Sequence, residues 1–126
     1  MKNNMENTYD YMVDFEAFMN NFKKTEVSGE EIGEMVARMA MYFARYNVRM
    51  GIALRAFSRV KADLQNQVDT ATGKPMSSAK ADTLSDATPE ANEYEMARIH
   101  IINLQEYINS LKSLQKGAMF EYSQQS

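Results

Sequence analysis

The sequence predicts an all-α protein in which long antiparallel helices pack in a coiled-coil-like way and a shorter helix precedes them. Apolar residues recur at three- and four-residue steps through most of the 126 residues, as they do on one face of a helix. The chain has only two prolines, and neither interrupts a periodic segment. No pair of alternating apolar and polar runs flanks a turn sequence, so we expect no β-hairpin.

Residues 1–27 are expected to form the shorter, N-terminal helix. Their apolar side chains recur with helical spacing, and acidic residues occupy the positions between them. The apolar positions are Met5, Tyr9, Met12, Phe15, Met19 and Phe22. The segment is therefore amphipathic, with one face suited to packing against another helix.

Residues 28–70 are expected to form a longer second helix. Ser28 and Glu31 have the spacing of a capping box, which marks the start of a helix. One apolar stripe then continues for about eight turns. It consists of Met35, Met39, Phe43, Tyr46, Met50, Leu54, Phe57, Val60 and Leu64. Gly73 and Pro75 are the stop signals that follow it.

Residues 71–88 are small and polar, and they read as a connector with one short helical turn around residues 78–84. Thr88 and Pro89 have the pattern of an N-cap followed by a proline at the first helical position. They predict a last helix over residues 89–122.

The last helix carries a wide apolar stripe. Its main positions step by three and four residues, as the a and d positions of a coiled coil do. They are Tyr94, Ala97, Ile101, Leu104, Ile108 and Leu111. Ile99, Ile102 and Leu114 widen the stripe beyond what one partner helix covers, and Gln115 is a polar break in it. We therefore expect one all-helical domain over residues 1–126, which forms a homo-oligomer through the six main positions.

Positive charge is concentrated in the middle of the chain. The formal net charge is −3, yet residues 35–62 carry six positive side chains and no negative one. These are Arg38, Arg45, Arg49, Arg55, Arg59 and Lys61. At about 100° per residue, the five arginines fall within an arc of roughly 120°. The apolar face centred on Met39 and Phe57 points the other way.

Met41, Val48 and Ile52 also lie within the arginine arc. Arginine interleaved with apolar side chains suits a contact surface, either for a phosphate backbone or for a neighbouring subunit. Both interpretations stay open, because the two flanking segments are acidic and their helices can pair with the arginines. All six basic residues are candidate nucleic-acid-binding residues. Tyr42 and Tyr46 flank the arc and either pack in the core or stack on bases.

Few residues suited to catalysis or metal binding occur. The chain has no cysteine, which excludes disulfides and thiol chemistry. Its single histidine, His100, cannot by itself form a typical zinc site, and we expect it to have a structural or surface role. The residue three before it is Ala97, not the glutamate of a di-iron bundle. We therefore expect a protein that is not an enzyme, with no catalytic residues, no metal site and no cofactor.

The N-terminus has no apolar run after its first lysine, so it does not read as a signal peptide. No stretch approaches the ~18 to 20 consecutive apolar residues of a membrane span. We expect a soluble cytoplasmic protein without a membrane partner.

Three features of residues 71–122 together suggest a family. They are a Lys-Pro start with a small turn, an aspartate before a Pro-Glu helix entry, and a Leu-Lys-x-Leu-type run followed by a glutamate. The residues concerned are Lys74, Pro75, Ser77, Lys80, Asp86, Pro89, Glu90, Leu111, Lys112, Leu114, Lys116 and Glu121. This half of the chain resembles the C-terminal half of UvsY-like recombination mediators of tailed phages. The long helix that precedes it fits the same layout, so the resemblance covers about two-thirds of the chain, residues 35–122.

The resemblance implies a small non-enzymatic protein that assembles into a ring-like homo-oligomer. Such a protein binds single-stranded DNA and helps to load a RecA-type recombinase onto strands covered by single-strand-binding protein. It would act in the cytoplasm of an infected bacterial host. The alternative from the charge pattern is a structural or interaction protein, such as a virion or scaffold component, without nucleic-acid binding.

Overall fold

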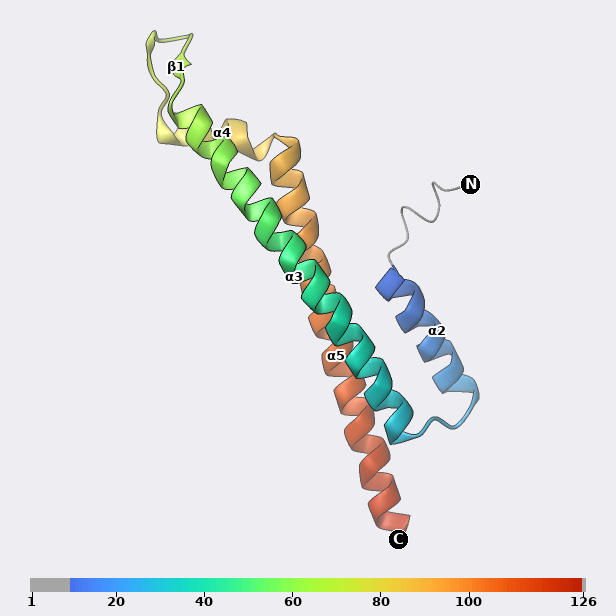
Figure 1. The fold of residues 1–126 in the computed structure, drawn as a ribbon. Coiled ribbons are helices and arrows are strands. Elements are labelled where there is room, and N and C mark those ends of the chain that lie inside the picture. The colour runs from blue at the N-terminus through green and yellow to red at the C-terminus, as the bar shows by residue number, and fades with distance from the viewer. Residues whose placement is uncertain (1–9, 126) are drawn as a thin grey trace, which may run out of the picture. The chain divides into compact units, whose positions relative to one another are not determined.

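The computed structural model describes the backbone of residues 10–125 and the side chains of residues 10–118, so the predicted positions Met5 and Tyr9 lie outside it. It confirms the all-α class. The helices are α2 (Asp10–Lys24), α3 (Gly29–Gln65), α4 (Ser78–Asp86) and α5 (Pro89–Gln125), shown in Figure 1. A small antiparallel sheet of β1 (Val68–Asp69) and β2 (Lys74–Pro75) lies between α3 and α4. Among the described residues, no helix has the length and apolar character needed to cross a membrane.

The helix starts agree with the capping signals. Ser28 Oγ accepts a hydrogen bond from the backbone N–H of Glu31 at 3.1 Å, and α3 begins at Gly29, directly after Ser28. Thr88 Oγ1 accepts from the N–H of Ala91 at 3.3 Å, which places Pro89 in the first turn of α5. Each cap satisfies an amide that has no partner within its own helix.

The expectation that no β-hairpin forms is wrong. β1 and β2 pair in antiparallel register, with Val68 opposite Pro75 and Asp69 opposite Lys74. Each strand has two residues, which is too short for an alternating pattern to be recognised in the sequence. Gly73 closes the turn with a φ of 70°, a value that glycine adopts without steric cost. Because the hairpin starts at Val68, α3 ends at Gln65, five residues before the predicted end at 70.

Contacts divide the described chain into two compact units, and the single all-helical domain over residues 1–126 stays a prediction. The first unit contains residues 10–44 and 102–125, and the second contains residues 45–101. α3 and α5 each contribute to both units.

In the first unit, α2 and the ends of α3 and α5 bury one apolar core. The core side chains are Tyr11, Val27, Ile32, Met35, Met39, Leu104 and Leu111. Aromatic rings attach α2 to α5: Phe15 of α2 stacks on Tyr107 of α5 with ring centroids 3.9 Å apart. Gln115, the polar break in the apolar stripe, donates from Nε2 to the carbonyl oxygen of Gly29 at 3.3 Å and so ties α5 to the start of α3.

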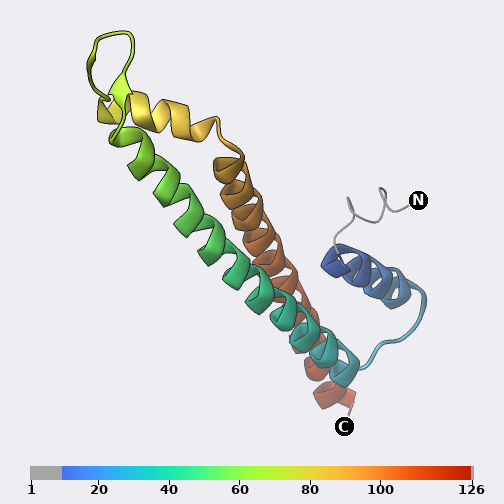
Figure 2. The same ribbon diagram turned by 45° about the horizontal axis from the view of Figure 1, so that its top comes forward.

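In the second unit, the rest of α3 and the first turns of α5 pack side by side, and α4 joins their ends in both views (Figures 1 and 2). The Phe57 and Tyr94 rings stack with centroids 5.9 Å apart. α4 buries Ala81 and Ser85 completely. The predicted helical turn at 78–84 is therefore a full helix, and Ser77 caps it by accepting the N–H of Lys80.

Candidate nucleic-acid interface

The exposed side of α3 in the second unit carries four arginines, which we call the arginine face. Arg45, Arg49, Arg55 and Arg59 are all exposed. Helical periodicity places them within an arc of about 120°, whereas Phe57 lies on the side of α3 that packs on Tyr94 of α5. No carboxylate occurs between residues 35 and 62 to neutralise them along the helix. The structure thus shows four exposed arginines on this part of α3, and their role in binding stays a prediction.

Two apolar side chains lie among these arginines. The side chain of Val48 is 63% exposed and that of Ile52 is 55% exposed, so both present apolar surface to solvent. Within the described part of the chain, Arg55 and Arg59 form no ion pair. Both guanidinium groups are therefore available to an oxygen acceptor from outside.

Arg49 is partly held by the protein. Its guanidinium lies 4.9 Å from the centroid of the Tyr46 ring, within cation–π distance. Tyr46 itself is buried and packs on the His100 ring, with centroids 4.9 Å apart. Base stacking by Tyr46 is therefore not supported, and core packing is its observed role. Burial, followed by the charge of Arg49, lowers the pKa of His100 below its ordinary value, so His100 is a neutral core residue at pH 7.

Lys61 does not join the arginine face. Its ammonium lies 4.7 Å above the Phe57 ring, on the side of α3 that packs against α5. At about 100° per residue, position 61 falls well outside the arginine arc. We therefore remove Lys61 from the candidate nucleic-acid-binding residues.

Arg38 belongs to the first unit and has an acidic neighbour there. Its Nη1 lies 4.0 Å from Oδ2 of Asp14 on α2, and its side chain is 58% exposed. The same Asp14 oxygen accepts a hydrogen bond from the Tyr42 hydroxyl at 2.7 Å. That bond is the main reason why the pKa of Tyr42 is raised. An acidic helix of the same chain thus contacts one arginine, as the alternative interpretation of the sequence anticipated.

Four of the six residues predicted to form an oligomer interface are buried within the single chain, and Tyr94 and Ile108 are partly exposed. Leu104 and Leu111 are fully buried in the first unit, and Ala97 and Ile101 are buried in the second. Tyr94 stacks on Phe57. Ile108 lines a shallow open pocket of about 370 Å³ with Phe43, Gln105 and Asn109. The buried members of this stripe pack within their own chain, and the interface with a second copy stays a prediction.

The exposed apolar residues of α5 lie elsewhere on the helix. Met96 and Ile99 are 37% and 40% exposed in the second unit, and Ile102 is 41% exposed in the first. The expectation that Ile99 and Ile102 exceed what one partner helix covers therefore agrees with their exposure.

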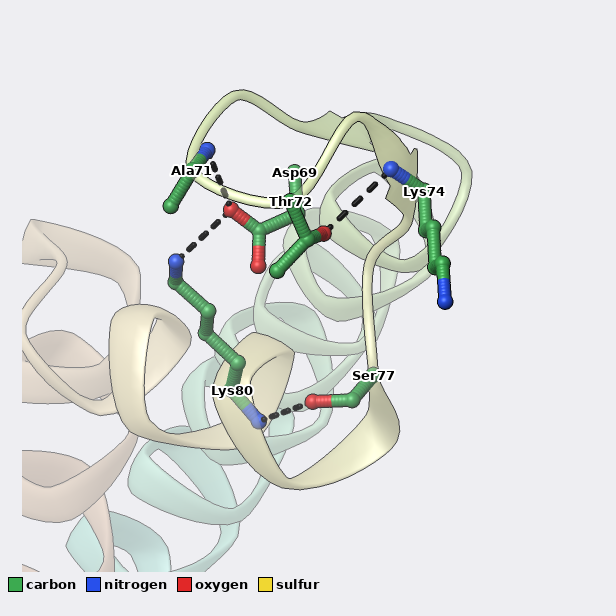
Figure 3. Close-up of polar contacts among 6 residues, drawn as sticks. All are labelled: Asp69, Ala71, Thr72, Lys74, Ser77 and Lys80. Atoms are coloured by element: carbon green, nitrogen blue, oxygen red, sulfur yellow. Dashed lines mark hydrogen bonds and ion pairs between the residues drawn. The ribbon is translucent and has the colours of Figure 1, made fainter.

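A cluster of polar contacts lies at the hairpin and the start of α4 (Figure 3). The carboxylate of Asp69 accepts a hydrogen bond from the Lys80 ammonium at 2.8 Å and another from the backbone N–H of Ala71 at 3.0 Å. The hydrogen bond from Lys80, then that from Ala71, lowers the pKa of Asp69. Lys80 and Asp69 are eleven residues apart, so the pair was not visible as a helical i,i+4 pattern. The cluster joins the hairpin to α4.

No set of three His, Cys, Asp or Glu side chains among the described residues is placed to hold a metal ion. Comparisons with protein-family models, curated proteins and solved structures gave no match.

Proposed function

We propose that this chain binds the phosphate backbone of single-stranded DNA through the arginine face of α3. The observation that supports this most directly is the exposure of four arginines on a helix segment without any carboxylate. Guanidinium groups pair with phosphate oxygens through two parallel hydrogen bonds, and arginine is favoured over lysine where that geometry matters. Val48 and Ile52 offer apolar surface beside the phosphate contacts, which suits the bases of an unpaired strand.

The biological role we propose follows the UvsY-like resemblance. The chain would act as a recombination accessory protein that helps a RecA-type recombinase to replace single-strand-binding protein on DNA. A homo-oligomer would place several arginine faces along one strand, which increases the effective concentration of binding sites. Recombinase ATPase activity on DNA covered with single-strand-binding protein, measured with and without this chain, tests that role.

The DNA-binding proposal is tested with a fluorescently labelled oligothymidine and the full-length chain. Anisotropy should report binding at low salt, and the affinity should fall as salt rises, because bound phosphates release counterions. With about four phosphates neutralised, the slope of log affinity against log salt for a single strand should be near −3. No binding at low salt would refute the proposal.

A matched pair of variants identifies the surface. Arg55→Gln with Arg59→Gln removes two charges from the arginine face and should weaken binding about tenfold or more, with a shallower salt slope. Lys112→Gln with Lys116→Gln removes two exposed charges from α5 in the first unit and so changes the net charge equally. The control pair should change affinity by much less. Equal losses in both pairs would mean that only the net charge matters.

A second function is favoured by the two exposed aliphatic side chains within the arginine face. Val48 and Ile52 suit a protein partner with an acidic amphipathic helix, as in a virion or scaffold assembly. Val48→Ser with Ile52→Ser should then abolish assembly, measured as native mass, while arginine changes give only a salt-dependent weakening. If the serine pair leaves the native mass unchanged, this second function is not supported.

A further inference from the structure

The contact between α2 and α3 in the first unit has the form of an occupied anion site. Arg38 and Tyr42 are four residues apart on α3, so both side chains extend from the same side of the helix. Their donors converge on one acceptor: Oδ2 of Asp14 lies 2.7 Å from the Tyr42 hydroxyl and 4.0 Å from Nη1 of Arg38. A hydroxyl and a guanidinium that share one carboxylate oxygen are equally suited to a phosphate oxygen.

The attachment of α2 does not depend on that carboxylate alone. Tyr11 is fully buried, and its ring lies 6.3 Å from that of Tyr42 and 5.9 Å from that of Tyr107. Phe15 stacks on Tyr107 with an interplanar angle of 3°. These aromatic contacts hold the helix, and Asp14 adds a charge at its margin, where its side chain is 32% exposed and Arg38 is 58% exposed. The acidic group can therefore be exchanged without unpacking the core.

The position of this site links it to the arginine face. Along the sequence, Arg38 lies seven residues before Arg45, which is about two helical turns. Arg38 is thus the first arginine of the same basic segment, and it pairs with Asp14 of α2.

We infer that Arg38 and Tyr42 form a binding site for a backbone phosphate of single-stranded nucleic acid, and that Asp14 occupies this site in the free protein. The inference rests on the proposed function and adds that the Asp14 carboxylate competes with the phosphate for this site. Binding exchanges one oxygen acceptor for another: the phosphate replaces the Asp14 carboxylate at Tyr42 and Arg38, and the carboxylate returns to water. A strand that binds through several phosphates makes this exchange favourable, since its phosphates are tethered to each other.

The test compares two variants that change the net charge equally. Asp14→Asn removes the competing charge but keeps a side-chain oxygen that can accept from Tyr42. Glu16→Gln removes an exposed carboxylate two residues away on the same helix. With labelled oligothymidine at low salt, Asp14→Asn should raise the affinity about three- to tenfold over wild type, which is the range expected when a competing charge-assisted hydrogen bond becomes a neutral one. Glu16→Gln should change it less than twofold.

A third variant separates the local contact from a general charge effect. In a background of Arg38→Gln with Tyr42→Phe, Asp14→Asn should have no more effect than Glu16→Gln, because both donors for which Asp14 competes are then missing. Circular dichroism checks that each variant keeps its helicity, and Asp14→Ser repeats the comparison if the asparagine disturbs packing. A second readout needs no nucleic acid: Asp14→Asn should lower the raised pKa of Tyr42, seen in a tyrosine absorbance titration, and Glu16→Gln should not.

The outcomes distinguish this inference from the proposed function. If the wild type binds with the expected salt dependence but Asp14→Asn and Glu16→Gln have equal affinities, the inference is overturned and the function stands. The same holds if the gain from Asp14→Asn persists in full in the background of Arg38→Gln with Tyr42→Phe. If neither the wild type nor any of these variants binds at low salt, the proposed function itself is refuted.

Discussion

Replacing Gly51 with alanine is expected to stabilise the protein by about 1 kcal/mol. Gly51 lies in the interior of α3, where glycine loses more conformational entropy on folding than alanine does. A Cβ placed on Gly51 would have no heavy atom within 4 Å, so nothing in the chain opposes the change. The gain should therefore be close to the full difference in helix propensity.

Gly33 is the matched control, because it lies in the same helix and has the same propensity to gain. Its Cβ would lie 2.7 Å from Nε2 of Gln115, which must therefore move. That amide donates to the carbonyl oxygen of Gly29, and losing the hydrogen bond costs about 1 kcal/mol. The two effects cancel, so Gly33→Ala is expected to leave the stability nearly unchanged.

Urea denaturation followed by circular dichroism measures both variants, at one protein concentration because assembly would couple to folding. A gain of 1 kcal/mol corresponds to a rise in Tm of about 3 to 6 °C for a chain of this size. Equal gains at the two positions would show that the contact of Gln115 with Gly29 adds nothing to stability. A loss at Gly51 would contradict the open space on that side of α3 and indicate a second copy seated there.

Two further predictions concern titration and the connector. Lowering the pH from 7.5 to 5 should destabilise the second unit, because the pKa of His100 is lowered in the folded chain and the unfolded chain therefore binds the proton more readily. Urea denaturation should show a smaller loss of stability on acidification in His100→Gln than in the wild type. An equal loss in both would contradict the view that His100 is buried in its neutral form. Asp69→Asn should speed proteolysis within residues 66–77 several-fold, because the charge-assisted hydrogen bond from Lys80 is lost. Asp63→Asn, which alters an exposed carboxylate, is the control, and equal cleavage of the two variants would show that the Asp69 cluster does not hold the connector.

Helix starts and the arginine arc could be predicted from the sequence, because both depend on local geometry. A serine or threonine accepts an amide three residues ahead whatever the rest of the chain does, as Ser28 and Thr88 do. The angular positions of arginines on a helix likewise follow from 100° per residue. The same rule separates Lys61 from the arginines, and grouping it with them by charge alone had overlooked this.

The hairpin could not be predicted in this way. Its strands have two residues each, and its Asp69 carboxylate pairs with Lys80, which lies on α4 beyond the turn. A pattern of alternating polarity needs four or more residues to be visible. The tertiary contact therefore decided that the connector folds.

What the sequence alone determined about this protein is the helical class, the helix starts and the exposed basic side of α3, because each of these follows from nearest neighbours along one helix. What only the tertiary structure decided is which surface covers which. An apolar stripe requires burial but does not specify its partner, since the hydrophobic effect is not directional, and Leu104 and Leu111 are buried within their own chain instead of against a second copy. The contacts of Tyr42 with Asp14 and of Gln115 with Gly29 join residues 28 and 86 positions apart. No local rule relates such positions, because their distance is set only when the helices pack.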